Sequence, residues 1–346
     1  MSRLLYFGNK PSPDEFKKHG LMVGTYSEMT CRRRCPKMHD YCYKQKLEKK
    51  IPSMPLTLGV LGHSLLETIY ANGGINSKGF TWEEVLELYK VDSWSQLSEE
   101  QQQEYGDLPE MAHRLLTGYE YHWQNESWNV LETEVSFLAR LTDKVGYAGV
   151  IDLIVEDSNG MIWVVDHKFT KNIPEDDYLS IDPQTSLYYW IATLKYGKDR
   201  VAGSILNYIR TKPPTVPSIN KDGTISKAKI DTDIPTLMKV IHDNGLNPDD
   251  YKDHIERAKV TTNQFYVRKR LDRPINLLKM TLREAVATIL DCNSKRPITR
   301  TLNKNCSWDC DYQPLCMAEI QGADTAFMIK QQYQIKEDKN KEVFKV

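Results

Sequence analysis

The sequence lacks an excess of charge of either sign, a long hydrophobic run, and any cysteine in its middle. Its 46 Lys+Arg nearly balance its 47 Asp+Glu, which gives a formal net charge of -1 at pH 7. This excludes a wholly cationic nucleic-acid coat, although a local basic groove would not show in the total. No run of about 18 apolar residues could span a bilayer, and no apolar segment near the start is typical of a signal peptide. We therefore expect a cytoplasmic protein without membrane contact.

The seven cysteines gather near the two ends of the chain, at Cys31, Cys35, Cys42, Cys292, Cys306, Cys310 and Cys316. An odd number argues against a fully paired disulfide framework, and clustered cysteines in a reducing setting more often hold metal. The last three have the spacing C-x3-C-x5-C and need a fourth donor, since tetrahedral zinc and most iron-sulfur sites take four. Cys42 and Cys292 are expected to be small core hydrophobes.

Hydrophobic periodicity predicts an α/β protein. Strands are expected at 129–141, 146–156, 160–169 and 201–210, and helices at 56–71, 110–124, 184–196, 235–244, 248–259 and 277–291. The turn sequence DSNG between two of the strands predicts a hairpin. Strands flanked by helices indicate a central mixed β-sheet with helical cover.

The length fits two domains or one elaborated α/β domain. Residues 211–233 are rich in Pro, Ser and Thr and predict a surface insertion. The expected regions are a basic N-terminal segment over 1–55, a core over 56–210 with a helical insertion at about 72–128, an insertion and helical region over 211–300, a cysteine cluster over 301–330 and a charged tail over 331–346.

Two carboxylates lie within apolar strands, Asp152 in GVIDLIV and Asp166 at the end of MIWVVD. A buried carboxylate is costly unless it is paired, protonated or bound to a cation. Strand alternation places Asp166 and Lys168 on one face and His167 on the other, and the hairpin brings Asp152 toward the same face. This arrangement predicts a cation site, although a simple Asp-Lys ion pair closing a strand would give the same tripeptide.

The pattern Asp152, Asp166, Lys168 resembles the PD-(D/E)XK nuclease superfamily. The resemblance implies a restriction-endonuclease-like core whose carboxylates hold Mg²⁺ or Mn²⁺, with the carbonyl of His167 as an extra ligand and the lysine activating water. His63 in GVLGHSLLE is similar to the helical histidine ligand of the RecB-like branch. Gln184 and Tyr188 in QTSLYYW are similar to the Q-x-x-x-Y motif of the same branch. Each could also be an ordinary core residue. Glu134 is similar to an acidic position in relatives, but an outward-facing strand glutamate is an equal interpretation.

Cys35, followed by Pro36, resembles the N-terminal cysteine of RecB-like nucleases with a [4Fe-4S] cluster, a group that includes the AddB subunit and CRISPR-associated exonucleases. The resemblance implies that Cys35 joins Cys306, Cys310 and Cys316. Relatives more often show two residues than three in the first C-terminal gap, Cys31 could replace Cys35, and zinc is an alternative to the cluster.

Residues 28–50 are basic, and Arg32, Arg33, Arg34 and Lys37 are candidate DNA-binding residues beside Tyr41 and Tyr43. A solvated helix face is the simpler interpretation of the same charges.

Together these features predict a metal-dependent exonuclease for single-stranded DNA or DNA ends that leaves 5′-phosphates, working with a helicase or recombinase partner. The sequence contains no G-x-x-x-x-G-K-[ST] motif, so a helicase motor would be another chain. The alternatives are a catalytically idle iron-sulfur DNA-binding or assembly subunit and a structural zinc protein.

Overall fold

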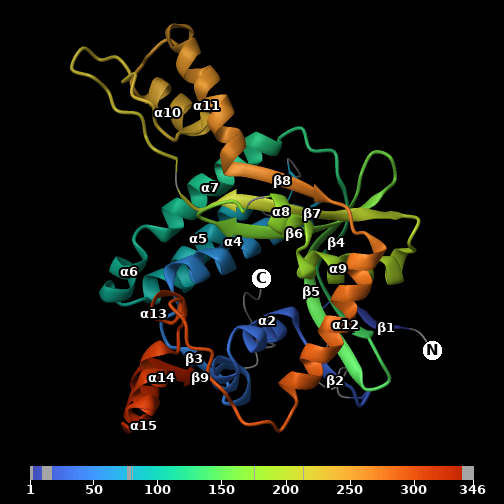
Figure 1. Ribbon diagram of the computed structural model, residues 1–346. Helices are drawn as coiled ribbons and strands as arrows, with labels where there is room; N and C mark the ends of the chain where they lie inside the picture. Colours follow the sequence, from blue (N-terminus) through green and yellow to red (C-terminus); the bar gives the residue numbers. More distant parts are fainter. Residues whose placement is uncertain are drawn as a thin grey trace. The chain divides into compact units, whose positions relative to one another are not determined.

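The computed structural model describes residues 3–9, 18–75, 79, 81–174, 176–212 and 214–336. The chain divides into two compact units, whose elements are labelled in Figure 1. Unit 1 comprises Met1–Pro52, Val135–Val150 and Pro274–Val346, and unit 2 comprises Ser53–Glu134 and Ile151–Arg273. Each unit is thus assembled from segments that are far apart in the sequence.

Seven strands form a mixed sheet in the order β1-β4-β5-β6-β7-β8, with β2 beside β5. They are β1 (Leu4–Gly8), β2 (Met22–Gly24), β4 (Asn129–Arg140), β5 (Val145–Glu156), β6 (Ile162–Thr170), β7 (Val201–Arg210) and β8 (Tyr266–Leu271). A separate antiparallel pair joins β3 (Leu47–Lys49) to β9 (Tyr333–Ile335). The predicted α/β class with a central mixed sheet flanked by helices is confirmed.

Within unit 2, β5 pairs antiparallel with β6, β6 parallel with β7, and β7 antiparallel with β8. The antiparallel pairing of β5 and β6 confirms the hairpin predicted from DSNG. The register places His167 opposite Asn207 and Asn207 opposite Arg268, so these residues form one row across three strands. Side chains in such a row share a face of the sheet and can interact directly.

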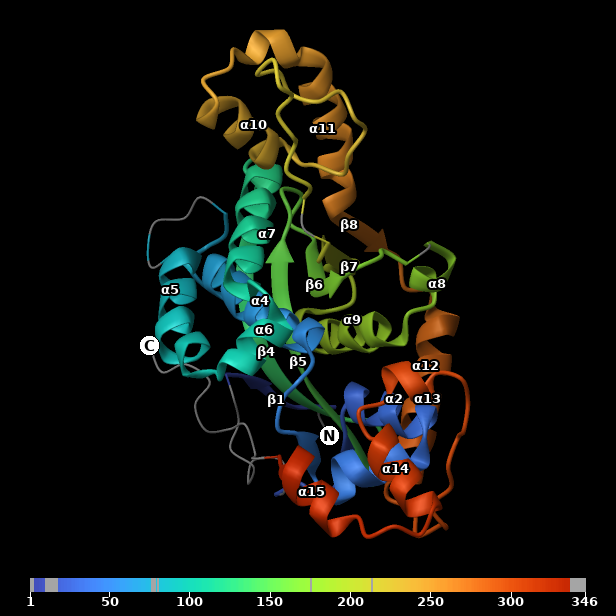
Figure 2. The ribbon, with the colours of Figure 1, turned by 90° about the vertical axis from the view of Figure 1, so that its left-hand side faces the viewer.

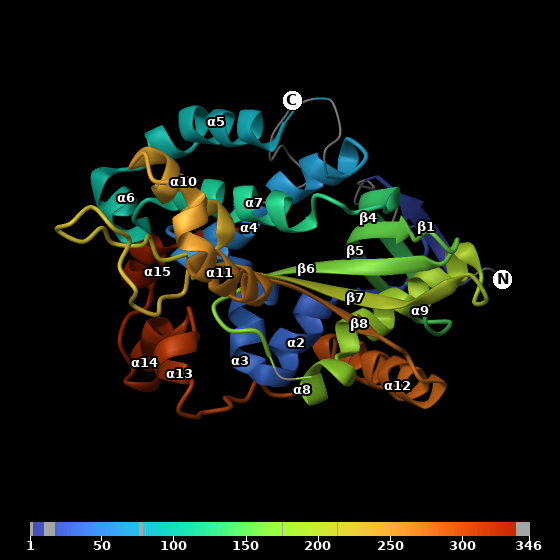
Figure 3. The same cartoon turned by 90° about the horizontal axis from the view of Figure 1, so that it is seen from above.

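The helices of unit 2 are α4 (Met54–Ala71), α5 (Trp82–Asp92), α6 (Glu99–Tyr105), α7 (Leu108–Trp123), α8 (Asp176–Ser180), α9 (Pro183–Tyr196), α10 (Ile234–Asp243) and α11 (Lys252–Phe265), with 3₁₀ turns η2 (Trp94–Gln96) and η3 (Pro248–Tyr251). Figure 3 shows α4 and α7 on one side of β6 to β8 and α9 on the other. Val165 and Ile205 pack in one core with α4 and α7, whereas Ser204, the neighbour of Ile205, donates a hydrogen bond to the carbonyl of Thr185 in α9. The sheet of unit 2 is therefore covered on both faces.

The helices of unit 1 are α2 (Tyr26–Arg34), α3 (Pro36–His39), α12 (Ile275–Cys292), α13 (Cys306–Asp309), α14 (Gln313–Ile320) and α15 (Ala326–Gln332), with a π-helical turn η1 (Asp40–Lys44). α12 packs against α2 and β2. Gly24 in β2 allows this approach, because a Cβ atom there would lie 2.7 Å from the side chain of Ile289. The C-terminal end of α12 is thus held close to the first helices of the chain.

Capping residues set where the helices of unit 2 begin. Thr81 and Glu84 form a capping box at the start of α5, and Ser98 and Gln101 form another at the start of α6. These reciprocal hydrogen bonds satisfy backbone N–H groups that have no partner within the helix. The acidic stretch 98–110 therefore contains α6 and the beginning of α7.

The structure adds β8 to the region 211–300, which the sequence predicted as an insertion and helical region. The sequence YVRKRL does not predict a buried strand, because three of its six residues are cationic. Residues 214–233 contain no helix or ladder strand, as expected, but Ile225 is buried against α10 and α11. Figure 2 shows α10 and α11 beyond the ends of α7 and β8.

The charged tail was predicted over 331–346, and its first residues are ordered. Strand β9 occupies Tyr333–Ile335 and pairs with β3. The rest of the predicted tail, 337–346, lies outside the described residues.

In the ranges that the structure describes, no helix is both long enough and apolar enough to cross a membrane.

Candidate metal centres

The first candidate centre is in unit 2, where Asp166 and Lys168 face each other at the end of β6. Asp166 Oδ2 lies 2.7 Å from Lys168 Nζ, and the side chain of Asp166 is only 3% exposed. The ring of His167, between them, points to the opposite face, where its Nδ1 lies 2.7 Å from Asn207 Nδ2. The predicted alternation is therefore present. The Asp-Lys ion pair that offered a simpler interpretation is also present, so the tripeptide alone does not decide between the two.

Burial and neighbouring charge act in opposite directions on this pair. Burial raises the pKa of Asp166 to about 7, with Lys168 opposing the rise and Asp152 adding to it. Burial lowers the pKa of Lys168, but the adjacent Asp166 outweighs it, so that the net shift is upward. Lys168 is therefore a cation at neutral pH. A carboxylate at contact distance stabilises the ammonium more than burial destabilises it.

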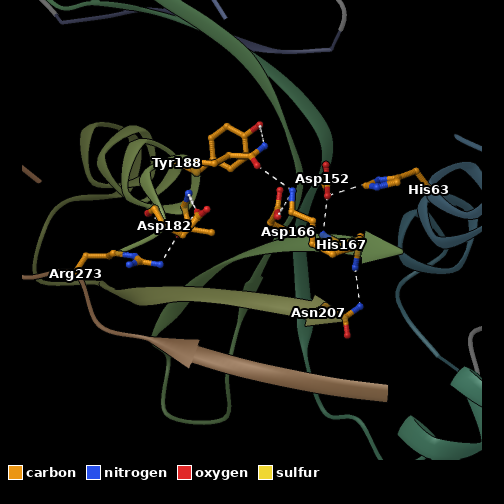
Figure 4. Close-up of polar contacts among 11 residues, drawn as sticks. His63, Asp152, Asp166, His167, Asp182, Tyr188, Asn207 and Arg273 are labelled. Carbon is orange, nitrogen blue, oxygen red and sulfur yellow. Dashed lines mark hydrogen bonds and ion pairs between the residues drawn. The ribbon is translucent and has the colours of Figure 1, made fainter. Parts of the chain in front are cut away.

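A short hydrogen-bonded chain connects Lys168 to α9 (Figure 4). Lys168 Nζ donates to Gln184 Oε1 at 2.9 Å, and Gln184 Nε2 donates to Tyr188 Oη at 3.1 Å. Gln184 and Tyr188 are one helical turn apart and so share a face of α9. The structure thus brings the Q-x-x-x-Y residues to the lysine.

The start of α9 is fixed by residues that the sequence analysis missed. Asp182 caps the helix by accepting from the backbone N–H of Thr185 at 2.8 Å, and Pro183 follows at the first helical position. Arg273 donates to the carbonyl of Ser180 at 2.9 Å and to the hydroxyl of Thr185 (Figure 4). A cap of this kind is worth about 1 kcal/mol and determines where Gln184 lies. The sequence Asp182-Pro183 is typical of a helix start and could have predicted this cap.

His63 and Asp152 form the other half of the centre. Asp152 on β5 accepts a hydrogen bond from the backbone N–H of His167 at 2.7 Å, and its Oδ2 lies 3.6 Å from Nδ1 of His63 on α4. Figure 4 shows the two side chains pointing toward each other. The side chain of His63 is 34% exposed and that of Asp152 is 13% exposed. A cation could therefore reach both from solvent.

Glu134, whose role the sequence left open, joins this pair. One ligand atom from each of His63, Glu134 and Asp152 lies within 4.8 Å of the others. Glu134 has φ 44°, in the left-handed region that non-glycine residues rarely adopt. Backbone strain of this kind persists where the surroundings enforce it, often at functional sites. The carboxylate that this strained residue carries is the one grouped with His63 and Asp152.

A buried polar network lies on the His167 side of the sheet. Tyr119 accepts hydrogen bonds from Asn207 at 2.9 Å and from Arg268 at 2.9 Å, and Arg268 also donates to Tyr70 at 3.0 Å. The ring of Tyr70 stacks on that of His167 with centroids 5.6 Å apart. The network therefore holds the His167 ring in place, and with it the backbone N–H that bonds Asp152.

Arg268 is enclosed at the centre of this network. Its guanidinium carbon lies 3.8 Å from the ring centroid of Trp123 and 3.9 Å from that of Trp128, and its Nη2 is 2.5 Å from Glu126. Burial lowers the pKa of Arg268, but nearby Tyr119, Tyr70 and Glu126 more than reverse this effect. Sequence reasoning missed this residue because β8 was not predicted.

The second candidate centre is in unit 1, where all four predicted cysteine ligands line one cavity of about 50 Å³: Cys35, Cys306, Cys310 and Cys316. Cys31 is buried in α2 and does not line this cavity. Three of the sulfurs face N–H donors, since Thr301 N lies 3.5 Å from Cys35, Asn303 N 3.5 Å from Cys306, and Arg300 Nε 3.4 Å from Cys316. Such donors stabilise thiolates, so this donor set suits a thiolate-bound metal group.

The candidate DNA-binding residues are engaged within unit 1. Arg32 is 9% exposed and its Nε lies 2.7 Å from Asp291, so its guanidinium is buried and paired, and a phosphate-binding role for it stays a prediction. Arg33 donates to Thr288 at 2.9 Å, and Arg34 lies 3.2 Å from Asp309. Lys37 lies 3.0 Å from Glu319 and 3.4 Å from Asp40. These charges hold unit 1 together.

Comparison with known proteins identifies the class of this chain. Residues 25–317 match the PD-(D/E)XK nuclease superfamily, and the chain belongs to it. No curated protein matches the sequence. Among solved structures, the one described as "Crystal structure of SSO0001" has 13% sequence identity and a TM-score of 0.26, over 68% of this chain and 81% of that chain.

Membership of the superfamily indicates the general chemistry of the centre in unit 2. The superfamily consists generally of nucleases that use divalent metal ions, and it implies a DNA substrate. His63, Glu134 and Asp152 offer a donor group that could hold such an ion. Carboxylate oxygens with one imidazole suit Mg²⁺ or Mn²⁺, so the residues present fit the group.

Proposed function

We propose that this protein is an exonuclease of the RecB-like branch that hydrolyses single-stranded DNA or DNA ends to 5′-phosphates with Mg²⁺ or Mn²⁺. One observation carries the proposal: within unit 2, the Asp166–Lys168 pair lies beside the His63–Asp152 pair, and Asp152 adds to the rise in the Asp166 pKa. A second carboxylate raises that pKa because two negative charges repel each other, and a divalent cation relieves this repulsion.

His63, Asp152 and Asp166 would hold the metal, with Glu134 and the carbonyl of His167 as further donors. When bound, the ion supplies positive charge to the scissile phosphate and lowers the pKa of water. The backbone N–H of His167 keeps one oxygen of Asp152 fixed at 2.7 Å, which sets the direction of the other. The preference of these cations for oxygen explains why the centre contains no sulfur donor.

Lys168 acts as a charged hydrogen-bond donor in this proposal. Because Asp166 raises its pKa, Lys168 remains an ammonium and positions the attacking water and the phosphate oxygen. Gln184 and Tyr188 hold the amine in place through the bonds of 2.9 Å and 3.1 Å. The attacking water releases a proton to solvent as its oxygen bonds to phosphorus, the bond from phosphorus to the 3′-oxygen breaks, and that oxygen takes up a proton from solvent.

Cys35, Cys306, Cys310 and Cys316 would hold a [4Fe-4S] cluster that stabilises unit 1, with zinc in the same thiolates as the alternative. The shared cavity and the N–H donors around the sulfurs support a thiolate-bound group. Arg33, Arg34 and Lys37 would approach DNA only at their exposed edges, since each already has a partner.

Degradation of end-labelled single- and double-stranded DNA by wild type and Lys168→Ala tests the proposal. Wild type should release label with Mg²⁺ or Mn²⁺ and none with chelator, and Lys168→Ala should lower the rate by roughly 10²- to 10⁴-fold. Lys212→Ala is the matched control, because Lys212 is also a lysine of unit 2 paired with an aspartate, at 2.8 Å from Asp231. Wild type that leaves every DNA substrate intact would contradict the proposal.

A further inference from the structure

A second group of metal-ligating side chains lies in unit 1, apart from the four-cysteine cavity. One ligand atom from each of Glu28, His39 and Cys292 lies within 4.8 Å of the others. His39 and Cys292 are each 1% exposed, and Nε2 of His39 lies 3.0 Å from Oε1 of Glu28. Neither the Asp-Lys centre nor the proposed iron-sulfur cluster uses these residues.

Three elements bring the donors together. Glu28 comes from the first turn of α2, His39 from the end of α3, and Cys292 is the last residue of α12. The Arg32–Asp291 ion pair at 2.7 Å joins α2 to α12 at the residue before Cys292. The hydrogen bond from Arg33 to Thr288 adds a second connection one turn away. The packing of the two helices therefore preforms the group.

Neighbouring side chains support two of the three donor residues, Glu28 and His39. Thr25 accepts from the backbone N–H of Glu28 at 3.2 Å and so holds the first turn of α2. The ring of Tyr43 stacks on His39 with centroids 5.4 Å apart and planes 20° apart. Such outer contacts orient metal ligands and are a usual feature of a metal site.

The donor types select the metal. A thiolate, an imidazole and a carboxylate suit zinc, whereas a sulfur donor disfavours magnesium and calcium. Zinc bonds of about 2.0 to 2.3 Å place tetrahedral ligand atoms about 3.3 to 3.8 Å apart, within reach of the observed group. A thiolate and a carboxylate also carry two negative charges, which a divalent ion neutralises in this buried position.

We propose that Glu28, His39 and Cys292 bind a zinc ion that joins α2 and α3 to the end of α12. Binding releases the thiol proton of Cys292 to solvent. The fourth tetrahedral position is available to a water, as in other sites with three protein ligands. Cys292 is then a ligand and not the core hydrophobe expected from sequence.

Zinc X-ray absorption on the full-length wild type, made in zinc-supplemented medium, tests the assignment without any variant. We expect about one zinc per chain with one sulfur and two or three nitrogen or oxygen neighbours. Zinc in the four-cysteine cavity would instead give four sulfur neighbours. Zinc with four sulfurs only, or wild type without zinc, would overturn the proposal.

Chelator competition on variants locates the ion. Cys292→Ser and His39→Gln should each weaken zinc affinity by more than about tenfold. Cys31→Ser is the matched control, because Cys31 is a buried thiol of α2 outside the group. Cys310→Ser should keep this zinc while losing the group held by the four cysteines. Unchanged zinc affinity in folded Cys292→Ser would also overturn the proposal.

Discussion

The two candidate centres differ in both their donors and their construction. The centre of unit 2 uses oxygen and nitrogen donors that project from regular elements, namely α4, β5 and β6. The cysteine centre of unit 1 uses sulfur donors in and next to short helices, and backbone N–H groups face two of the sulfurs. Hard carboxylates suit ions that exchange with solvent and substrate, and soft thiolates suit a group that stays bound.

The two centres also differ in how well their charges are neutralised. In unit 2 burial raises the pKa of Asp166 to about 7, although Lys168 lies 2.7 Å from its carboxylate. In unit 1 the basic residues beside Cys35 have acidic partners, such as Asp309 for Arg34 and Glu319 for Lys37. Perturbed pKa values such as that of Asp166 are frequent at catalytic sites, whereas paired surface charges mainly support the fold. Substitutions in the two units should therefore have different effects.

The largest expected effect is on activity in unit 2. Asp166→Asn removes a metal donor and the partner of Lys168, so the nuclease rate should fall by roughly 10³-fold or more. Iron content should not change, because the cysteines lie in the other unit. Asp231→Asn, which breaks the exposed pair with Lys212, should keep full activity. Equal losses in both variants would show that Asp166 acts only through folding.

Loss of a cysteine ligand in unit 1 should change metal content and stability first. Cys310→Ser should lose its bound iron and the absorbance of the cluster, and the melting temperature should fall, since metal binding contributes to folding. Metal analysis and thermal unfolding measure both. Cys31→Ser serves as control and should keep its iron. Cys310→Ser with wild-type iron would remove this cysteine from the ligand set.

A smaller effect is expected from the network behind His167. Asn207→Leu removes the partner of Nδ1 of His167 and of Nε of Arg268, so the free energy of unfolding should fall by about 1–3 kcal/mol. The catalytic rate constant should fall roughly tenfold with little change in KM, because the backbone of His167 positions Asp152. Asn129→Leu, at an exposed site, should change neither quantity.

The smallest effect concerns acid stability of unit 1. The hydrogen bond from Arg32 lowers the pKa of Asp291 below its ordinary value, which is about 3.9. The pair therefore stabilises the fold fully above that ordinary value, and the stabilisation is lost as pH falls through the lowered pKa. Asp291 is 38% exposed, so solvent screening limits the effect to about 1 kcal/mol.

Denaturant unfolding of wild type and Asp291→Asn between neutral and acid pH measures this contribution. The difference between the two proteins should be greatest at neutral pH and should vanish in acid. A constant difference at all pH values would mean that the ion pair does not contribute.

Much of the unit 2 centre was predictable because its geometry follows from short-range periodicity. Strand alternation determines that Asp166 and Lys168 share a face, and helical spacing determines that Gln184 and Tyr188 do. The turn DSNG then predicts the hairpin that brings Asp152 close. These rules need only a few neighbouring residues.

The remaining features depend on contacts between distant segments, which such rules do not reach. The sequence of β8 does not by itself indicate a buried strand. Its Arg268 is buried among aromatic and acidic partners from α7 and the loop after α7. The left-handed backbone of Glu134 is likewise imposed by its surroundings. The pairing of Arg32 with Asp291 joins residues 259 positions apart, which no local pattern indicates.

Metal-dependent catalysis at the unit 2 centre is tested most directly by release of label from single-stranded DNA as Mg²⁺ is added after chelation. Purified full-length wild type is compared with Asp152→Asn. We predict that wild type regains activity with Mg²⁺ and that Asp152→Asn, still folded and with its iron unchanged, does not. Cleavage by Asp152→Asn at the wild-type rate, or by wild type in chelator, would contradict this mechanism.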